Sequence, residues 1–249
     1  MSLDFLAPDL TQPYKGVLPV IRSPIRSLLE NAGARFRERD RWEVPASFGD
    51  PAEEQAACLH SVGIADQSNL GKLELQAEPE IVDQIATELA GDPVRSGLAV
   101  NRDGTWWCRL RPSRLLAVMP PESTPEARAS LEGAAARSDR WASVTELTTS
   151  LGSNAVVGPL ARETFARLSA LDLRERELGP CGFAPGSVAR VPGMVLRERG
   201  DRYLHLFGAA YAEYIWTVFL DAAEALGGRA VGADALAAIT PAIGAADGS

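Results

Sequence analysis

The feature that most constrains the fold of this chain is its series of short apolar segments. Along the chain, the spacing of apolar residues in these segments changes repeatedly between the period of a strand and the period of a helix. Leu115–Met119 has the length and composition of a buried strand, whereas Ile81–Leu89 carries its apolar residues on one helical face. Tight turns such as Arg102-Asp103-Gly104 and Arg111-Pro112-Ser113 separate successive strands. Strands joined by such short turns pair antiparallel, so we predict an α+β fold of mixed or antiparallel sheets with helices.

The predicted helices begin at Ser, Pro or acidic signals, and several end at glycine. They cover residues 23–33, 51–63, 81–89, 125–136, 160–168, 210–226 and 233–239. The predicted strands cover 42–48 (a strand or a loop), 71–75, 97–101, 105–110, 115–119, 144–149, 154–157, 188–191, 193–198 and 202–207. In the strand at 71–75, Leu73 and Leu75 alternate with Lys72 and Glu74, which predicts one face in water.

The two halves of the chain share one order of elements, strands, helix, strands and helix, without a strict sequence repeat. We therefore predict two related α+β lobes, at residues 23–140 and 141–241. Residues 1–22 contain three prolines and little periodicity, which predicts an extended N-terminal arm. Residues 242–249 are small and polar enough to form a flexible tail.

Composition excludes several classes of function. The formal net charge of −8 repels phosphate backbones, which argues against nucleic acid as a partner. The three cysteines form no CxxC pair and the chain has two histidines, so we predict neither a disulfide framework nor a metal site. The sequence shows no secretory leader and no apolar run of membrane-spanning length, so we expect a cytoplasmic protein without membrane contact.

Five segments in a fixed order carry a resemblance to a known family. In the first half they are the helix of Ser23–Ala34, the turn Trp42-Glu43-Val44-Pro45, and a GxxDxSxMG-like motif at 63–71 in which Leu70 replaces the methionine. In the second half they are Gly158-Pro159-Leu160-Ala161 with Leu171-Asp172-Leu173, and the helix around Trp216 followed by Val231–Leu236. The chain is therefore similar to the glycine-cleavage T-proteins, which are aminomethyltransferases, and to the sarcosine oxidase gamma subunit and the folate-binding iron–sulfur repair protein.

This resemblance implies an aminomethyltransferase-like folate-binding fold, with a cavity between two lobes in which a one-carbon unit moves onto tetrahydrofolate. In the family, an Asp in a GGxxDD turn holds the folate amine, and the Glu of a TGE motif grips the pterin ring. The corresponding turn here is 101–108, where no carboxylate follows Gly104, and the TGE core is replaced within 197–205. The family's Tyr and Arg positions hold Ser96 and Thr240, and we expect no C-terminal barrel of the family. We therefore predict no aminomethyltransferase activity.

The resemblance places a surviving ligand site between the lobes. The candidate ligand-binding residues are Leu70, Asn101, Asp103, Trp106, Trp107, Arg197 and Tyr203. Either tryptophan could stack on a flat ligand or belong to the core, because neighbouring strand residues face opposite sides. Tight binding of tetrahydrofolate is not expected unless new acceptors replace the lost carboxylates. We interpret Cys108 as a buried, inert thiol and His205 as structural.

Three functions are compatible with these residues. The first is a protein with a folate-type or other flat-ligand cavity and one-carbon-related or rewired chemistry. The second is a non-catalytic, gamma-like subunit of a larger sarcosine- or dimethylglycine-type oxidase. The third is an interaction module with a filled pocket. A binder needs an open cavity, whereas a subunit needs an exposed apolar patch.

Overall fold

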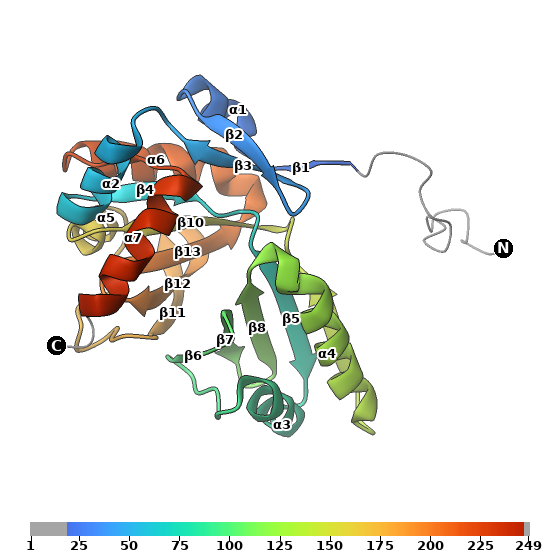
Figure 1. Ribbon diagram of the computed structural model, residues 1–249. Coiled ribbons are helices and arrows are strands. Elements are labelled where there is room, and N and C mark those ends of the chain that lie inside the picture. The colour runs from blue at the N-terminus through green and yellow to red at the C-terminus, as the bar shows by residue number, and fades with distance from the viewer. Residues whose placement is uncertain (1–18, 247–249) are drawn as a thin grey trace.

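The computed structural model describes residues 19–246, which form a mixed α and β structure built on three sheets (Figure 1). The largest sheet has six strands. In spatial order they are β11 (Phe183–Val188), β12 (Val191–Arg199), β13 (Arg202–Gly208), β10 (Leu151–Val157), β4 (Gly63–Asp66) and β14 (Arg229–Ala230). All neighbours in it are antiparallel except β14 and β4. The predicted α+β class is confirmed, since no doubly wound parallel sheet exists within these residues.

The second sheet has five antiparallel strands. Their order is β6 (Ala99–Arg102), β7 (Thr105–Arg111), β8 (Arg114–Met119), β5 (Gly71–Ala77) and β9 (Ala142–Glu146). The third is a small sheet in the order β1 (Ile21–Arg22), β3 (Trp42–Ser47) and β2 (Arg35–Arg39), beside the short helix α1 (Arg26–Asn31). Its β2–β3 hairpin reaches toward the five-stranded sheet, as Figure 1 shows.

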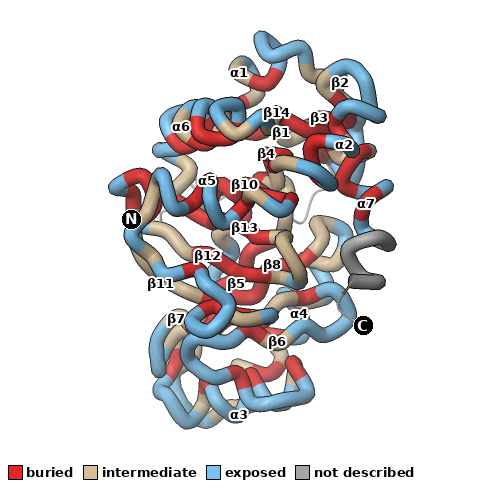
Figure 2. The backbone as a smooth tube through the Cα atoms, turned by 90° about the vertical axis from the view of Figure 1, so that its left-hand side faces the viewer, coloured by how far each residue is buried: buried red, intermediate tan, exposed pale blue. Residues whose placement is uncertain are grey.

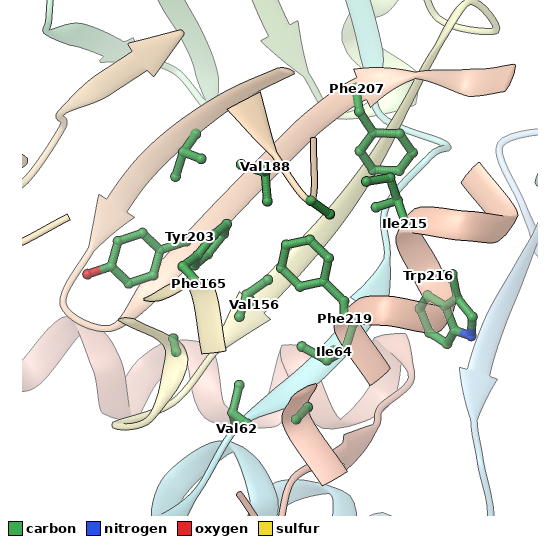
Figure 3. Packing of buried hydrophobic residues seen from close by; sticks show 14 of the residues in the cluster. Val62, Ile64, Val156, Phe165, Val188, Tyr203, Phe207, Ile215, Trp216 and Phe219 are labelled. Atoms are coloured by element: carbon green, nitrogen blue, oxygen red, sulfur yellow. The ribbon is translucent and has the colours of Figure 1, made fainter. Parts of the chain in front are cut away.

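The six-stranded sheet is covered on both faces. Helices α5 (Ala161–Leu168) and α6 (Ala212–Glu224) pack on one face, where Phe165, Tyr203 and Phe219 meet in an apolar core (Figure 3). On the other face, α2 (Pro51–His60) and α7 (Ala233–Ala246) pack against β4 and β10. The five-stranded sheet contributes to a core with β11, β12 and β13, and its opposite face carries α3 (Pro79–Ala90) and α4 (Thr124–Arg137).

The prediction that Lys72 and Glu74 face water is wrong. Both side chains are buried, with Lys72 0% and Glu74 2% exposed. The physical reason is that this face of the five-stranded sheet packs on the six-stranded sheet through residues such as Leu116 and Leu204, while Leu73 and Leu75 face the helices. Figure 2 shows the largely buried backbone of β5 and β8 near β12. Strand alternation revealed the two faces, but it cannot tell water from a second sheet that carries a few buried charges.

Two strand predictions also need correction. The segment 188–191 is not a strand but the turn of the β11–β12 hairpin, in which Ala189 and Arg190 have φ angles of 51° and 64°. Strand β2 was missed because Arg35–Arg39 contains a single apolar residue, Phe36, and so shows no alternation of apolar residues. Strands β4, β11 and β14 were not predicted either, and α7 extends beyond the predicted 233–239. The other predicted helices and strands lie within a few residues of their observed positions.

The predicted arm, lobes and tail can be compared with the observed helices and strands. Of the predicted arm, residues 1–18 lie outside the described residues, and Ile21–Arg22 form β1, which pairs with β3. Of the predicted tail, residues 242–246 belong to α7, and residues 247–249 lie outside the described residues. The division at 140/141 stays a prediction. The sheets do not follow it, since β4 belongs to the six-stranded sheet and β9 to the five-stranded one.

Candidate functional site

A cavity of about 360 Å³ lies where α7, the β2–β3 hairpin and the five-stranded sheet meet, and we call it the α7 pocket. Its lining comes from four places: the hairpin, the turn after β4, the segment after β8, and α7 with the start of β13. The lining residues are Arg37, Arg39, Val44, Ala46, Gln67, Asn69, Leu70, Pro120, Pro121, Glu122, Arg202, Ala233, Asp234, Leu236, Ala237 and Thr240. A volume of this size is typical of small-molecule sites.

Four of the five charged side chains in the lining of the α7 pocket pair with each other at its rim. Arg37 donates to Asp234 at 2.8 Å, and Arg39 donates to Glu122 at 3.4 Å. Arg202 is bonded to Glu198, which lies outside the lining. The two carboxylates in the lining are therefore already matched by guanidinium groups, and the interior of the pocket is mainly apolar, with Val44, Leu70 and Leu236 in its wall.

The turn that contributes Asn69 and Leu70 rests on a buried polar cluster. Asp66 ends β4 and accepts hydrogen bonds from the backbone N–H and the hydroxyl of Ser68, at 3.1 and 2.6 Å. Burial raises the pKa of the Asp66 carboxyl, while its bonds from Ser23 and Ser68 and the charge of Lys72 act in the opposite direction. Burial lowers the pKa of Lys72 to about 7, opposed by the nearby Asp66 charge. Two ionisable groups thus lie directly behind the pocket wall.

Among the candidate residues, Leu70 is the one that lines the α7 pocket. Trp106 is half-buried and packs with Leu70 against the core between the two large sheets, so the two residues share one apolar cluster. Asn101 pairs with Trp106 across the β6–β7 hairpin and is exposed. The structure therefore brings Trp106 close to the wall of the pocket without placing it in the lining.

Asp103 and Trp107 lie on the other side of the five-stranded sheet. The Asp103 side chain is 94% exposed at the tip of the β6–β7 turn, where its φ angle of 51° precedes Gly104 at 81°. Trp107 is 5% exposed and belongs to the core beneath α3 and α4. Both residues line a small hollow of about 190 Å³, in which the buried Trp107 Nε1–H has no hydrogen-bond acceptor.

Arg197 and Tyr203 are buried structural residues. The Arg197 guanidinium donates to the carbonyls of Leu178 and Gly200, at 3.0 and 2.9 Å, and lies over the Tyr203 ring. The Tyr203 ring packs against Phe165 in the core on the far face of the six-stranded sheet (Figure 3). These two residues are not assembled with Leu70.

Cys108 and His205 are both buried. Burial raises the pKa of the Cys108 thiol, which keeps it protonated and unreactive. His205 lies among the rings of Phe165, Phe207 and Phe219, and neither ring nitrogen has a hydrogen-bond partner. Burial lowers the pKa of His205 to about 3, so this side chain is neutral at physiological pH.

A second cavity, of about 560 Å³, lies on the other side of the β2–β3 hairpin, between its tip and the start of α4. We call it the hairpin cavity. It shares Asn69, Pro121 and Glu122 with the α7 pocket, so the turn after β4 and the segment before α4 form a common wall. The Oδ1 atom of Asn69 is buried in this wall without a donor.

Sequence reasoning missed most of the α7 pocket. Arg37 and Arg39 lie on strand β2, which was not predicted. Asp234 lies in the first turn of α7, a helix that was predicted without its packing beside the β2–β3 hairpin. The alternation of arginines at 35, 37 and 39 is the signal that could have identified this strand. Across the described part of the chain, no group of three or more His, Cys, Asp and Glu side chains could hold a metal ion. Nor is any helix in that part long and apolar enough to cross a membrane.

Comparison with known proteins agrees with this architecture. The chain is 28% identical over 211 residues to a probable aminomethyltransferase of Natronomonas pharaonis, a match that covers 78% of this chain and 58% of the relative. Its structure resembles the glycine cleavage system aminomethyltransferase T of Bartonella henselae, with a TM-score of 0.70, 17% identity, and coverage of 87% of this chain and 60% of that one.

A second solved structure is similar over nearly its whole length. It is a chain of the heterotetrameric sarcosine oxidase of Corynebacterium sp. U-96, with a TM-score of 0.64, 20% identity, and coverage of 83% of this chain and 96% of that one. The chain thus spans less than two thirds of the length of its aminomethyltransferase relatives. Residues 25–240 match the family model of the GCVT N-terminal domain, and the chain belongs to this aminomethyltransferase-like family.

Proposed function

We propose that the α7 pocket binds a flat, folate-type ligand and that the chain does not transfer aminomethyl groups. The observation that carries this proposal is an open pocket of about 360 Å³ whose wall includes Leu70, one of the residues that the family resemblance assigns to the ligand site. The apolar wall of Val44, Leu70 and Leu236 suits a planar ring, whose burial contributes about 25 cal/mol per Å².

The lack of a free carboxylate supports the negative half of the proposal. In the α7 pocket, Glu122 and Asp234 are each paired with an arginine, and Asp103 is exposed at a turn tip outside the lining. A folate amine that carries developing positive charge needs a carboxylate acceptor, because charge-assisted hydrogen bonds are the strong ones. We therefore propose one-carbon-related ligand binding, or rewired chemistry, with the family's Asp lost.

Two measurements test the proposal. Melting temperature is recorded with tetrahydrofolate, 5-formyltetrahydrofolate, folate and pterin-free aromatic acids, since a ligand that binds the folded chain at 100 times its Kd adds about 2.7 kcal/mol of stability. Formation of methylenetetrahydrofolate from an aminomethyl-loaded carrier protein is followed in parallel. We expect a folate to raise the melting temperature and no product to form. If no folate raises the melting temperature, the proposed ligand binding is wrong. If methylenetetrahydrofolate forms, the proposed lack of aminomethyl transfer is wrong.

A specific observation favours a second candidate, a gamma-like subunit of a heteromeric oxidase. The chain resembles the sarcosine oxidase chain over 96% of the length of that chain. Exposed aromatic side chains also occur at Tyr211, Tyr214 and Trp141, and such residues often carry the energy of interfaces. Co-expression with the other subunits of a heterotetrameric sarcosine oxidase, followed by light scattering, tests this candidate. Elution of this chain as a separate species would argue against it.

A further inference from the structure

The segment Gln67–Leu70 occupies a special place in the fold. It joins β4 of the six-stranded sheet to β5 of the five-stranded sheet, so it is a direct covalent crossing between them. It also provides the wall between the α7 pocket and the hairpin cavity, because Asn69 lines both and Leu70 lines the α7 pocket. The conformation of these few residues therefore decides the shape of the pocket.

The six-stranded sheet holds the first part of this segment. The Gln67 N–H donates to the carbonyl of Ser153 at 2.8 Å, and the Ser153 hydroxyl donates to the carbonyl of Gln67 at 2.7 Å. The Leu70 N–H closes the turn by donating to the carbonyl of Gln67 at 3.1 Å. These bonds leave the carbonyls of Ser68 and Leu70 to be satisfied from elsewhere.

Lys72 satisfies both carbonyls. Its Nζ donates to the carbonyl of Ser68 at 3.0 Å and to that of Leu70 at 2.9 Å, from a side chain that is 0% exposed. The Lys72 backbone is itself fixed, because its N–H donates to the Thr148 hydroxyl at 3.2 Å and its carbonyl accepts from Leu147. The lysine thus ties the crossing segment to the five-stranded sheet.

Burying the Lys72 ammonium group beside this turn carries a large cost in desolvation free energy. Desolvation of such an ion costs several kcal/mol, and apolar replacements of buried charges are often neutral or stabilising. No carboxylate of the described residues forms a salt bridge with Lys72, so Asp66 compensates it only at longer range. The two hydrogen bonds from Lys72 to the carbonyls of Ser68 and Leu70 offset part of this desolvation cost, and they stabilise the pocket wall.

We propose that Lys72 is a positioning residue of the α7 pocket: by holding the carbonyls of Ser68 and Leu70, it fixes Asn69 and Leu70 as the wall that meets the ligand. This inference rests on the proposed function for its binding readout. It assigns Lys72 no contact with the ligand, because the lysine side chain is enclosed and does not line either cavity.

The experiment compares Lys72→Met with the matched variant Arg114→Met. Arg114 pairs with the buried Glu74 farther along the same strand pair, so its loss also disturbs a buried charge of this sheet but leaves the 67–70 turn alone. Dissociation constants for 5-formyltetrahydrofolate are measured by calorimetry, and the free energy of unfolding by urea titration. Exchange of the Gln67 and Leu70 amide protons is followed by NMR.

We expect Lys72→Met to weaken binding by about tenfold, in line with the loss of hydrogen bonds to a charged group. In Lys72→Met, the amide protons of Gln67 and Leu70 should exchange faster than in the wild type. Arg114→Met should lose stability while its Kd stays within about twofold of the wild type. Equal changes of Kd in the two variants, or unchanged exchange in Lys72→Met, would overturn the inference.

Two further outcomes are separated by design. If Lys72→Met does not fold, Lys72→Gln takes its place. Its shorter side chain can replace only part of the two carbonyl bonds, so we expect a smaller weakening of binding in the same direction. If the wild type binds no folate, the proposed function fails. The exchange comparison between the Lys72 and Arg114 variants then still decides whether Lys72 holds the crossing segment.

Discussion

Acid should destabilise this protein through one histidine. His205 is enclosed by three phenylalanine rings, and burial lowers its pKa from 6.5 to about 3. The unfolded chain binds a proton at this side chain below pH 6.5, whereas the folded chain does not. The resulting stability is therefore present above pH 6.5 and is lost as the pH falls toward 3, at about 1.4 kcal/mol per pH unit.

The magnitude follows from the two pKa values. Between pH 7.5 and 4.5, His205 alone should lower the free energy of unfolding by about 3 kcal/mol, a large share of the 5–15 kcal/mol of an ordinary domain. The variant His205→Leu removes this contribution and also removes two buried nitrogens without partners. Its stability relative to the wild type should therefore improve by about 3 kcal/mol over the same pH interval.

Urea titrations of both proteins at the two pH values provide the assay, and their difference cancels the carboxylates that titrate in this range. His60, the other histidine of the chain, is exposed on α2, so His60→Gln serves as the control. If His205→Leu and the wild type lose the same stability on acidification, the enclosed histidine is not the acid-sensitive group and this reasoning is refuted.

Three more predictions concern stability and can be checked by urea titration. Burial lowers the pKa of Lys72 to about 7, so the stability of the wild type relative to Lys72→Met should rise by up to about 4 kcal/mol between pH 7 and 10, and an unchanged difference would contradict this. Asp50→Ala should cost about 1 kcal/mol, because Asp50 caps α2 by accepting from the Ala52 N–H, and an unchanged midpoint would contradict it. Gly232→Ala should cost more than about 2 kcal/mol, since its new Cβ would lie 2.1 Å from a backbone oxygen, whereas Gly133→Ala on α4 should be neutral or stabilising.

Local patterns in the sequence predicted most of the elements of the fold. Gly91 ends α3 in the left-handed conformation, as expected of a helix-terminating glycine, and the Asp103-Gly104 turn joins β6 and β7. Each of these signals depends on a few neighbouring residues, so it can be recognised without knowledge of the tertiary structure. Which strands share a sheet is not local, and for this reason the mixed membership of β4 and β9 could not be read from the order of the chain.

The candidate site was harder to predict because its residues come from distant segments. Leu70 was found through a motif, but its neighbours Arg37 and Asp234 are almost two hundred positions apart in sequence and meet only in the folded chain. Lys72 looked like a solvated residue because alternation does not report on a second sheet. Tyr203 and Arg197 were chosen for a motif position, and the structure uses both in its core.

The central claim is that the α7 pocket is the ligand site, and two adjacent residues of α7 test it most directly. Both residues are exposed, but Ala237 lines the pocket and Ala238 does not. Both Ala237→Trp and Ala238→Trp add an indole to the same helix, so they differ mainly in whether the pocket is filled. Calorimetric titration with 5-formyltetrahydrofolate should show binding to the wild type and to Ala238→Trp and none to Ala237→Trp. Equal affinity in the two variants would contradict the account.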